Sequence, residues 1–179
     1  MARNSDRLLA AAMTTLAQTP QASLEQIAEA AGVARTTLFR HFRTRQELLR
    51  ALAEEAVRQC TEAAAPSLGS ALPPDEKLRR AVKALIPLGA ALRFLSYQPC
   101  RSADPELERI NAGYLEPWKS IVPELKHAGF LAPDIPLPWA VALLDMLIFG
   151  AWEAIHHGDL APNCAAELVV RTFFRGVGA

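Results

Sequence analysis

Apolar residues in this chain recur every three or four positions, the spacing that places them along one face of an α-helix. In the first 20 residues the repeat consists of Leu9, Ala12, Met13 and Leu16, and Pro20 ends it. Alternation of β-branched and polar residues, which marks a half-buried strand, is almost absent from the sequence. The pattern therefore predicts an all-α protein.

A helix, a tight turn and a short helix are predicted next. Ser23 and Gln26 have the spacing of a capping box, in which each side chain accepts a hydrogen bond from the other residue's backbone N–H. Gly32 ends this helix, because glycine adopts the left-handed turn conformation at little cost. The short helix is expected at about 34–42.

Capping residues and prolines predict the remaining helices. Thr44 and Glu47 repeat the capping-box spacing and begin a helix over 45–65, and the proline-rich segment 65–75 is the most loop-like connector. A helix is expected over 75–95, capped by Asp75 and kinked at Pro87. The segment 104–127 begins at Asp104-Pro105 and is stopped by Ala128-Gly129, and Pro117 and Pro123 make it two helices or one bent helix. The last two helices are expected over 138–157 and 163–175.

The neutral net charge of the chain hides an uneven distribution. The 19 basic and 19 acidic residues cancel, but the first 50 residues hold seven arginines and four acids, a net charge of +3, and the remainder carries −3. Five of those arginines lie between residues 35 and 50. Arginine presents a planar fork of donors that suits phosphates and guanine edges, so nucleic acid stays a candidate partner.

The segment 23–49 has the order of a helix-turn-helix motif: a helix, a glycine turn and a short second helix. A rotation of about 100° per residue from the apolar Leu38 defines the outward face of the short helix. An ordinary solvated face is the alternative, but the apolar register, the caps and the basic charge together favour groove binding. The outward residues are Thr36, Arg40 and Arg43, flanked by Thr37 and Phe39, with Arg35 at the entrance.

The string IAEAAGVARTTLFRHFRTRQELL, residues 27–49, resembles the TetR/AcrR family of bacterial transcriptional regulators, and the match extends over about 5–55. The resemblance implies a three-helix DNA-binding domain over 1–50, a connecting helix over 45–65, and a helical-bundle domain over 66–179 that binds ligand and dimerises. It also implies a homodimer, a double-stranded DNA operator and a small-molecule inducer that relieves repression, although activation stays open.

The same resemblance assigns individual contacts. Ala34 stands where the family often has a capping serine, and Phe39 stands where tyrosine is usual, so the hydroxyl for a phosphate contact is missing. His41 also has a purely structural interpretation, because it lies nearer the core side of the helix. The implied base contacts are Arg35, Thr36 and Thr37, and the implied phosphate contacts are Ser23, Phe39, His41 and Arg45.

The last two helices carry more apolar surface than one side of a small bundle can bury. Paired about a two-fold axis, two such helices per subunit would form a four-helix dimer interface, whereas in a monomer both would be core helices. The candidate interface residues are Leu143, Leu147, Trp152, Leu168, Val169 and Phe173.

An inducer pocket in this family lies among the middle helices, and an apolar pocket is expected here for a hydrophobic or aromatic molecule. Asp145 and His156 are either polar groups of that pocket or groups at the dimer interface, where Asp145 would pair with an arginine or a backbone donor. The pocket candidates are Phe94, Leu95, Tyr97, Tyr114, Trp118, Met146 and Phe149.

Other classes of protein find little support in the sequence. Three widely spaced cysteines suit a reducing cytoplasm, and the apolar stretch 139–152 is shorter than the about 20 residues that cross a bilayer. Glu153, His156 and His157 form an incomplete metal-ligand set, and nucleophile-elbow, P-loop and zinc-protease motifs are missing. No catalytic residue, metal or cofactor is therefore predicted. A helical small-molecule-binding protein with a vestigial helix-turn-helix is the alternative function.

Overall fold

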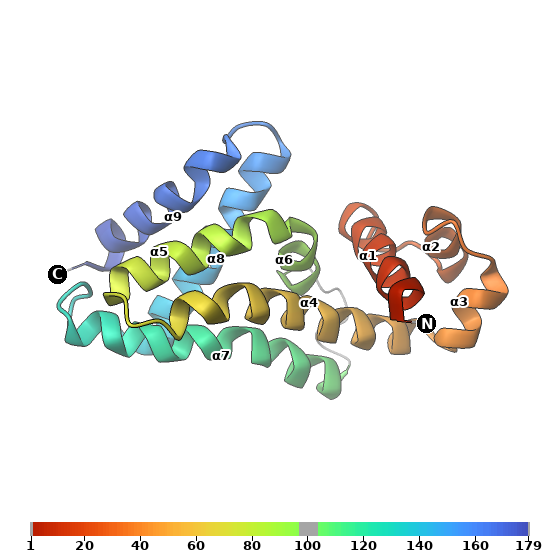
Figure 1. The fold of residues 1–179 in the computed structure, drawn as a ribbon, viewed down its shortest axis with the longest axis horizontal. Helices are drawn as coiled ribbons and strands as arrows, with labels where there is room; N and C mark the ends of the chain where they lie inside the picture. Colours follow the sequence, from red (N-terminus) through yellow and green to blue (C-terminus); the bar gives the residue numbers. More distant parts are fainter. Residues whose placement is uncertain (1, 97–103, 179) are drawn as a thin grey trace. The chain divides into compact units, whose positions relative to one another are not determined.

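The computed structural model describes residues 2–96 and 104–178, and the regular structure within these ranges is helical throughout (Figure 1). The predicted all-α class is confirmed. The elements are α1 (Ala2–Gln18), α2 (Leu24–Ala30), α3 (Arg35–His41), α4 (Arg45–Leu68), α5 (Pro74–Leu85), the 3₁₀ turn η1 (Ile86–Leu88), α6 (Gly89–Ser96), α7 (Pro105–His127), α8 (Leu137–His156) and α9 (Pro162–Val177).

The helices form two compact units. The first comprises residues 1–59 and 90–113, and the second comprises residues 60–89 and 114–179. The helices α4 and α7 contribute residues to both units. The sequence predicts a different division, into a DNA-binding domain over 1–50, a connecting helix over 45–65 and a second domain over 66–179, and this functional division stays a prediction.

The core of the first unit is built from the apolar faces that the sequence predicts. In α1 the buried residues include Leu8, Ala12, Met13 and Leu16, whereas Leu9 is half-buried. Burial of such side chains supplies about 25 cal/mol per Å² of apolar surface, which is the main force that holds short helices in place. Other buried apolar residues of this unit include Ile27, Ala28, Leu38, Leu48 and Leu52.

The two predicted capping boxes differ in detail. At α2 the box is complete, since the Gln26 N–H donates to Ser23 Oγ at 3.2 Å and the Ser23 N–H donates to Gln26 Oε1 at 2.8 Å. Before α4 the Glu47 N–H donates to Thr44 Oγ1 at 3.1 Å, but the Glu47 carboxylate accepts from the N–H of Arg43 at 2.8 Å. In a standard capping box the Glu47 carboxylate would accept from the N–H of Thr44, so here it binds the backbone one residue earlier.

Prolines act differently at different positions. Pro73 occupies the N-cap of α5 and Pro74 its first turn, so the expectation that Asp75 caps this helix is wrong; proline suits that turn because its missing N–H has no helical partner there. At Pro87 the helix is replaced by η1, which separates α5 from α6. In contrast, α7 is one continuous helix with Pro117 and Pro123 inside it.

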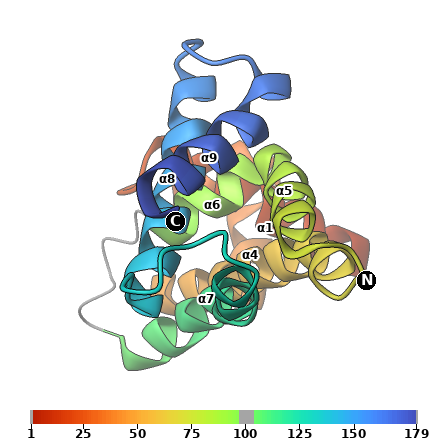
Figure 2. The ribbon, with the colours of Figure 1, turned by 90° about the vertical axis from the view of Figure 1, so that its left-hand side faces the viewer.

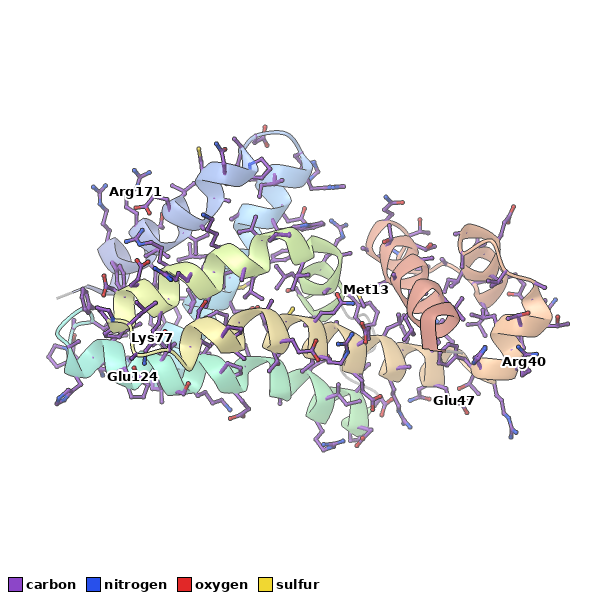
Figure 3. All side chains as sticks on the ribbon, viewed as in Figure 1. Met13, Arg40, Glu47, Lys77, Glu124 and Arg171 are labelled. Atoms are coloured by element: carbon purple, nitrogen blue, oxygen red, sulfur yellow. The ribbon has the colours of Figure 1, made fainter. Side chains whose placement is uncertain are left out.

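In the second unit, α8 and α9 lie side by side, and α5 packs along α9 (Figures 1 and 2). The ion pair between Lys77 Nζ and Glu124, 2.8 Å apart, joins the start of α5 to the end of α7 (Figure 3). Gly129 follows α7 with a φ of +77°, as the predicted stop requires. The fully buried large side chains of the unit include Leu78, Leu85, Trp118, Ile121, Leu125 and Phe173.

The helix α8 is apolar but largely uncovered. By length and composition it could cross a membrane, with a mean hydropathy of 1.4, yet only 22% of the window that meets this test is buried. Trp139 and Met146 on this helix are 59% and 56% exposed. A soluble single chain rarely leaves so much apolar surface open unless a partner covers it.

Candidate DNA-binding surface and ligand-binding hollow

The connection between α2 and α3 has the geometry of a helix-turn-helix. Gly32 has a φ of +63°, and the Val33 N–H donates back to the Ala28 carbonyl at 3.0 Å, which reverses the chain tightly. Ala28 and Leu38 are buried and hold the two helices together. Ala34 makes no side-chain cap bond, as its identity predicts.

The face of α3 opposite Leu38 is open to solvent. Thr36 and Arg40 are exposed, as the helical register predicts, and Arg40 projects from α3 away from α1 (Figure 3). Arg43 is exposed as well, but α3 ends at His41, so Arg43 lies in the turn that follows and not on the helix face predicted for it. Thr37 and Phe39 are half-buried beside this face, and Ser23 at the start of α2 is exposed. His41 is exposed as well, so it does not pack into the core.

Arg35 makes two contacts that the sequence did not indicate. A nitrogen of its guanidinium lies 2.8 Å from a carboxylate oxygen of Glu25 in α2, and its central carbon lies 5.0 Å from the ring centroid of Phe39. A hydrogen bond from its own backbone N–H, the Ser23 hydroxyl and the charge of Arg35 hold the pKa of Glu25 below its ordinary value. Glu25 could have been singled out only by its place in the first turn of α2, because no periodicity links it to Arg35.

Arg45 is occupied by the backbone. Its guanidinium donates to the carbonyl oxygens of Ala22 and Pro20, the latter at 2.6 Å, and so fastens the start of α4 to the turn between α1 and α2. The phosphate contact of Arg45 stays a prediction. The hydrogen bonds to the two carbonyls give this side chain a structural role in addition.

A second arginine pairs with a buried acid. Arg50 donates two hydrogen bonds to Asp104, of 2.7 and 2.9 Å, and the Asp104 side chain is only 2% exposed. This bidentate pair lowers the pKa of Asp104 from 3.8 to about 2. Asp104 also accepts from the N–H of Glu106 at 3.1 Å, which fulfils its predicted role at the start of α7.

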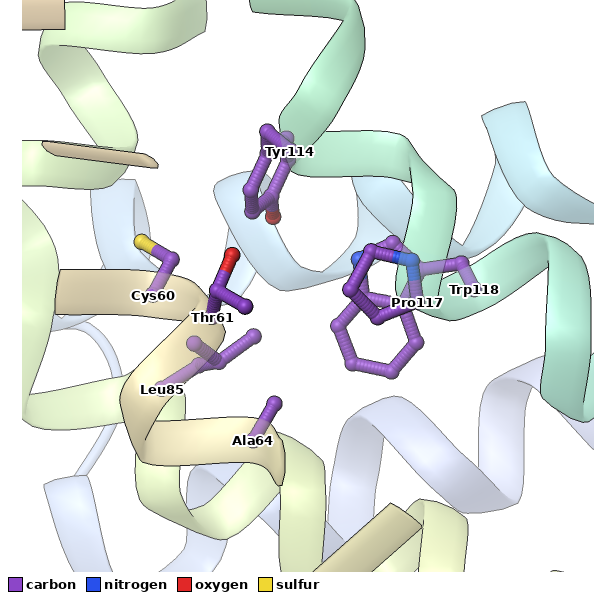
Figure 4. Close-up of a pocket in the computed structure, with 7 residues that line it drawn as sticks. All are labelled: Cys60, Thr61, Ala64, Leu85, Tyr114, Pro117 and Trp118. Atoms are coloured by element: carbon purple, nitrogen blue, oxygen red, sulfur yellow. The ribbon is translucent and has the colours of Figure 1, made fainter. Parts of the chain in front are cut away.

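The second unit contains a small hollow between α4, α5 and α7 (Figure 4). The empty space at this site, about 170 Å³, includes open solvent and leaves no enclosed room for even one water molecule, whereas pockets that enclose drug-sized ligands measure roughly 300–1,000 Å³. Two predicted pocket residues, Tyr114 and Trp118, belong to its wall. The residues that line this hollow are Cys60, Thr61, Ala64, Leu85, Tyr114, Pro117 and Trp118.

The hollow is lined by apolar groups and a few polar ones. Burial raises the pKa of the Cys60 thiol to about 12, and the carboxylate of Asp145 adds to this rise. Burial also raises the pKa of Tyr114 well above its ordinary value, again with a contribution from Asp145. Asp145 itself is half-buried in α8. His156 is exposed and stacks on Trp152, with 5.2 Å between ring centroids.

The other predicted pocket residues do not line this hollow. Phe94 and Leu95 are buried in the first unit, and Tyr97 lies outside the described residues. Phe149 stacks near Trp152, with 6.3 Å between ring centroids. Met146 is on the exposed side of α8, so its assignment to an interior pocket is corrected.

The exposed surface of α8 and α9 differs in part from the predicted interface. Val169 and Phe173 are 2% and 0% exposed, so they belong to the core of the unit and cannot meet a partner. In this unit α9 packs on both α8 and α5, and spacing alone could not tell this burial from burial under a partner's helix. Leu168 is 37% exposed, and Leu143, Leu147 and Trp152 are half-buried.

The histidines near the end of α8 do not form part of a larger ligand set among the described residues, which hold no group of three or more potential metal ligands. His157 Nε2 lies 3.4 Å from a Glu153 oxygen, one helical turn away. The pair is an ion pair when the histidine is protonated.

A helix-turn-helix whose second helix exposes hydroxyl groups and arginines is typical of DNA-binding proteins. Residues 8–52 match the family model described as "Bacterial regulatory proteins, tetR family". The chain is 38% identical over 160 residues to the HTH-type transcriptional repressor LfrR of Mycolicibacterium smegmatis, a match that covers 87% of this chain and 81% of LfrR. The chain belongs to the TetR family of transcriptional regulators.

Other comparisons agree with this assignment. The HTH-type transcriptional regulator NfxB of Pseudomonas aeruginosa is 28% identical over 178 residues, 97% of this chain and 94% of NfxB. The crystal structure of LfrR from Mycobacterium smegmatis in complex with proflavine superposes with a TM-score of 0.82 at 31% identity, covering 99% of this chain and 98% of that one. The fatty acid degradation regulator FadR of Bacillus halodurans, 19% identical with a TM-score of 0.75 and coverage of 97% and 99%, shares the fold.

Proposed function

We propose that this regulator is a repressor that binds a palindromic DNA operator as a homodimer and is released by a small, hydrophobic inducer. The observation that carries the proposal is the two-sided character of α3, where Thr36 and Arg40 are exposed and Leu38 is fully buried, with Arg43 exposed in the turn that follows. Hydroxyls and guanidinium groups can read base edges in the major groove, and the cations also neutralise phosphates. Repression is favoured over activation because LfrR is named a repressor.

Within this proposal the residues divide into two groups. Those at the start of α3 read base edges, because the N-terminal end of a recognition helix enters the groove first. Those around it contact phosphates and orient the domain without reading sequence. Arg35, Thr36 and Thr37 form the first group, and Ser23, Arg40, His41, Arg43 and Arg45 form the second. Phe39, which has no hydroxyl for a phosphate, packs against a sugar or a thymine methyl group instead.

Dimerisation is supported by the uncovered apolar surface of α8 and α9. Trp139, Met146 and Leu168 are exposed, and Leu143 and Leu147 are half-buried. Two such helix pairs, related by a two-fold axis, would bury this surface as a four-helix interface. A dimer can present two recognition helices one helical turn of DNA apart, about 34–36 Å, which a single chain cannot do.

The inducer site proposed is the hollow beside Tyr114 and Trp118. The LfrR structure with proflavine supports a planar organic ligand for a related fold. Because the hollow has no enclosed room for such a ligand in this conformation, ligand binding requires α4, α5 and α7 to move apart. Helix α4 provides Cys60 and Thr61 to the wall and continues back to the DNA-binding helices. A ligand that prefers a spacing unsuited to DNA then weakens operator binding by about 1–3 kcal/mol of coupling.

This function needs no catalysis, and it places the protein in the cytoplasm, where bacterial DNA is found. The Cys60 thiol, with its pKa raised to about 12, is protonated at neutral pH and is a poor nucleophile.

The proposal is tested by selecting bound duplexes from a random-sequence DNA pool with the purified chain. The selected duplex and a scrambled duplex of the same composition are then compared in gel-shift titrations at several salt concentrations. Proflavine is added as the probe of induction. We expect a selected sequence with two-fold symmetry, tighter binding than to the scrambled duplex, and release of the selected duplex by proflavine or a related planar ligand.

The outcomes separate the two candidate functions. The vestigial-domain alternative has one structural observation in its favour, which is the missing side-chain cap at Ala34. It predicts equal, weak binding to both duplexes together with saturable ligand binding. Selective DNA binding by the chain overturns that alternative, and the lack of any selectivity overturns the proposed repressor.

A further inference from the structure

The guanidinium of Arg35 is restrained from two sides before any DNA is present. Glu25 reaches it from α2 with a 2.8 Å ion pair, and the ring of Phe39, one turn further along α3, lies 5.0 Å away. Both side chains of the ion pair are substantially exposed, 67% for Arg35 and 47% for Glu25. An exposed pair of this kind adds little to folding stability.

We propose that Glu25 is a positioning residue for DNA recognition: its carboxylate, with the Phe39 ring, holds Arg35 in the orientation from which it reads a base. The inference rests on the proposed function, in which α3 enters the major groove. It assigns a role in sequence reading to an acidic residue on the other helix of the motif, and it gives Phe39 a role that does not need the missing hydroxyl.

The physical reason is the flexibility of arginine. A free arginine loses much rotamer entropy when it is fixed on a base edge, and a side chain already ordered loses less. The fork of guanidinium donors can discriminate guanine only in a defined plane, whereas phosphate contacts tolerate many orientations. Restraint of Arg35 therefore increases selectivity more than it increases overall affinity.

Simple charge repulsion predicts an unchanged ratio of affinities for the selected and scrambled duplexes. If Glu25 acts only as a negative charge near the phosphates, its removal strengthens binding to every duplex by the same factor. A third possibility is that Glu25 holds Arg35 away from the DNA, in which case its removal increases selectivity. The ratio of affinities for the selected and scrambled duplexes distinguishes the three roles.

The experiment compares Glu25→Gln with the wild type on the duplex selected by the wild-type chain and on its scrambled counterpart. Glutamine keeps the size and the hydrogen-bond acceptor but removes the charge. The matched control is Glu29→Gln, an exposed acid on the same helix. Thermal unfolding of each variant checks that the fold is intact. The expected result is a roughly three- to tenfold fall in the affinity ratio for Glu25→Gln and an unchanged ratio for Glu29→Gln.

A double-mutant cycle with Arg35→Ala then shows whether Glu25 acts through Arg35. In the Arg35→Ala background, Glu25→Gln is expected to leave the affinity ratio unchanged, because the restrained group is gone. An equal effect in both backgrounds, an unchanged ratio in the single variant, or a raised ratio each overturns the inference while the repressor function stands. If the wild type shows no selectivity at all, the proposed function and the inference fail together.

Discussion

Arginine side chains of the first unit serve two purposes that a count of charges cannot separate. Arg40 and Arg43 are exposed on the outward face of α3 and the turn that follows it. Arg45 donates to two backbone carbonyls, and Arg50 forms a bidentate pair with Asp104. The positive charge of the segment is therefore partly available to DNA and partly used to hold the helices together.

Substitution of Arg45 by alanine is expected to lower both stability and DNA affinity. The carbonyls of Ala22 and Pro20 lose a charged donor, and such bonds contribute about 1.5–3 kcal/mol each at most. Urea unfolding should show a lower free energy of unfolding by about 1–3 kcal/mol. Gel shifts should show a loss of affinity that is similar for all sequences, because no base contact is removed.

Two control variants complete this comparison. Arg43→Ala removes an exposed charge, so it should reduce the salt dependence of DNA binding and leave the unfolding curve unchanged. Arg35→Ala should relax discrimination at one operator position. If Arg45→Ala left stability unchanged, the structural role assigned to this side chain would be wrong.

The Arg50–Asp104 pair predicts a pH dependence of stability. Pairing lowers the pKa of Asp104 from 3.8 to about 2 in the folded state, so the ionised form favours folding. Its contribution is complete above pH 4 and is lost as the pH falls from about 4 towards 2. Asp104→Asn keeps a good helix cap but removes the charge, so this variant should be less stable at neutral pH.

The measurement is urea unfolding of the wild type and Asp104→Asn at intervals between pH 2 and pH 7. The stability difference between them is expected to shrink as the pH falls through that window. Parallel stability curves across the whole range would show that Asp104 does not contribute through its charge.

At the scale of elements, local environment decides what a proline does. Pro87 coincides with η1 and ends α5, whereas Pro117 and Pro123 lie within the unbroken α7. Pro123 and Lys119, four residues before it, are both exposed, where water can satisfy the carbonyl that loses its helical partner. A sequence pattern shows where a hydrogen bond is lost, but not whether packing keeps the helix together across it.

The start of α6 depends on the small size of Gly89. A Cβ atom on this residue would overlap the indole ring of Trp152 in α8. Its φ of −54° is ordinary helical backbone, so the neighbouring ring, and not the conformation, excludes a side chain. Gly89→Ala is expected to destabilise the chain by about 1–3 kcal/mol through overpacking.

Trp152→Ala provides the test of that cause. In the Trp152→Ala variant the methyl group added at residue 89 has space. Alanine is also a better helix former than glycine, so Gly89→Ala should be neutral or stabilising in this variant. Thermal and urea unfolding of the four chains give the coupling energy. Equal destabilisation in both backgrounds would place the obstacle somewhere other than the indole ring.

At the scale of the whole molecule, the exposed apolar surface of α8 and α9 predicts the oligomeric state. Leu168→Glu places a charge in the proposed interface, where burial without a partner is costly. Sedimentation analysis should therefore give a dimer for the wild type and a monomer for the variant. DNA affinity should fall strongly, since a single recognition helix contacts only one half-site.

Ala112→Glu is the matched control for the dimer prediction, because it adds the same charge to an exposed position of α7. It should remain dimeric and keep its DNA affinity. A monomeric wild type, or a Leu168→Glu variant that is still dimeric, would contradict the proposed interface.

Much of the molecule was predictable because its determinants are local. Helical periodicity, the Ser23–Gln26 capping box and the turn at Gly32 involve residues within a few positions of one another, and they fix which side of α3 faces outward. The family motif lies in the same segment, so the class of function was predictable with it. These features depend on short-range hydrogen bonds and on the 3.6-residue helical turn, so they can be recognised from residues that are neighbours in the sequence.

Contacts between residues distant in sequence were decided only by the tertiary structure. Arg45 with the carbonyls before α2, Arg50 with Asp104, and Gly89 under Trp152 each join segments that no spacing rule connects. The same holds for Phe173, which packs inside its own unit although its helix would equally suit a partner. Periodicity states that one face of a helix is apolar, but the surface that covers that face depends on how the whole chain packs.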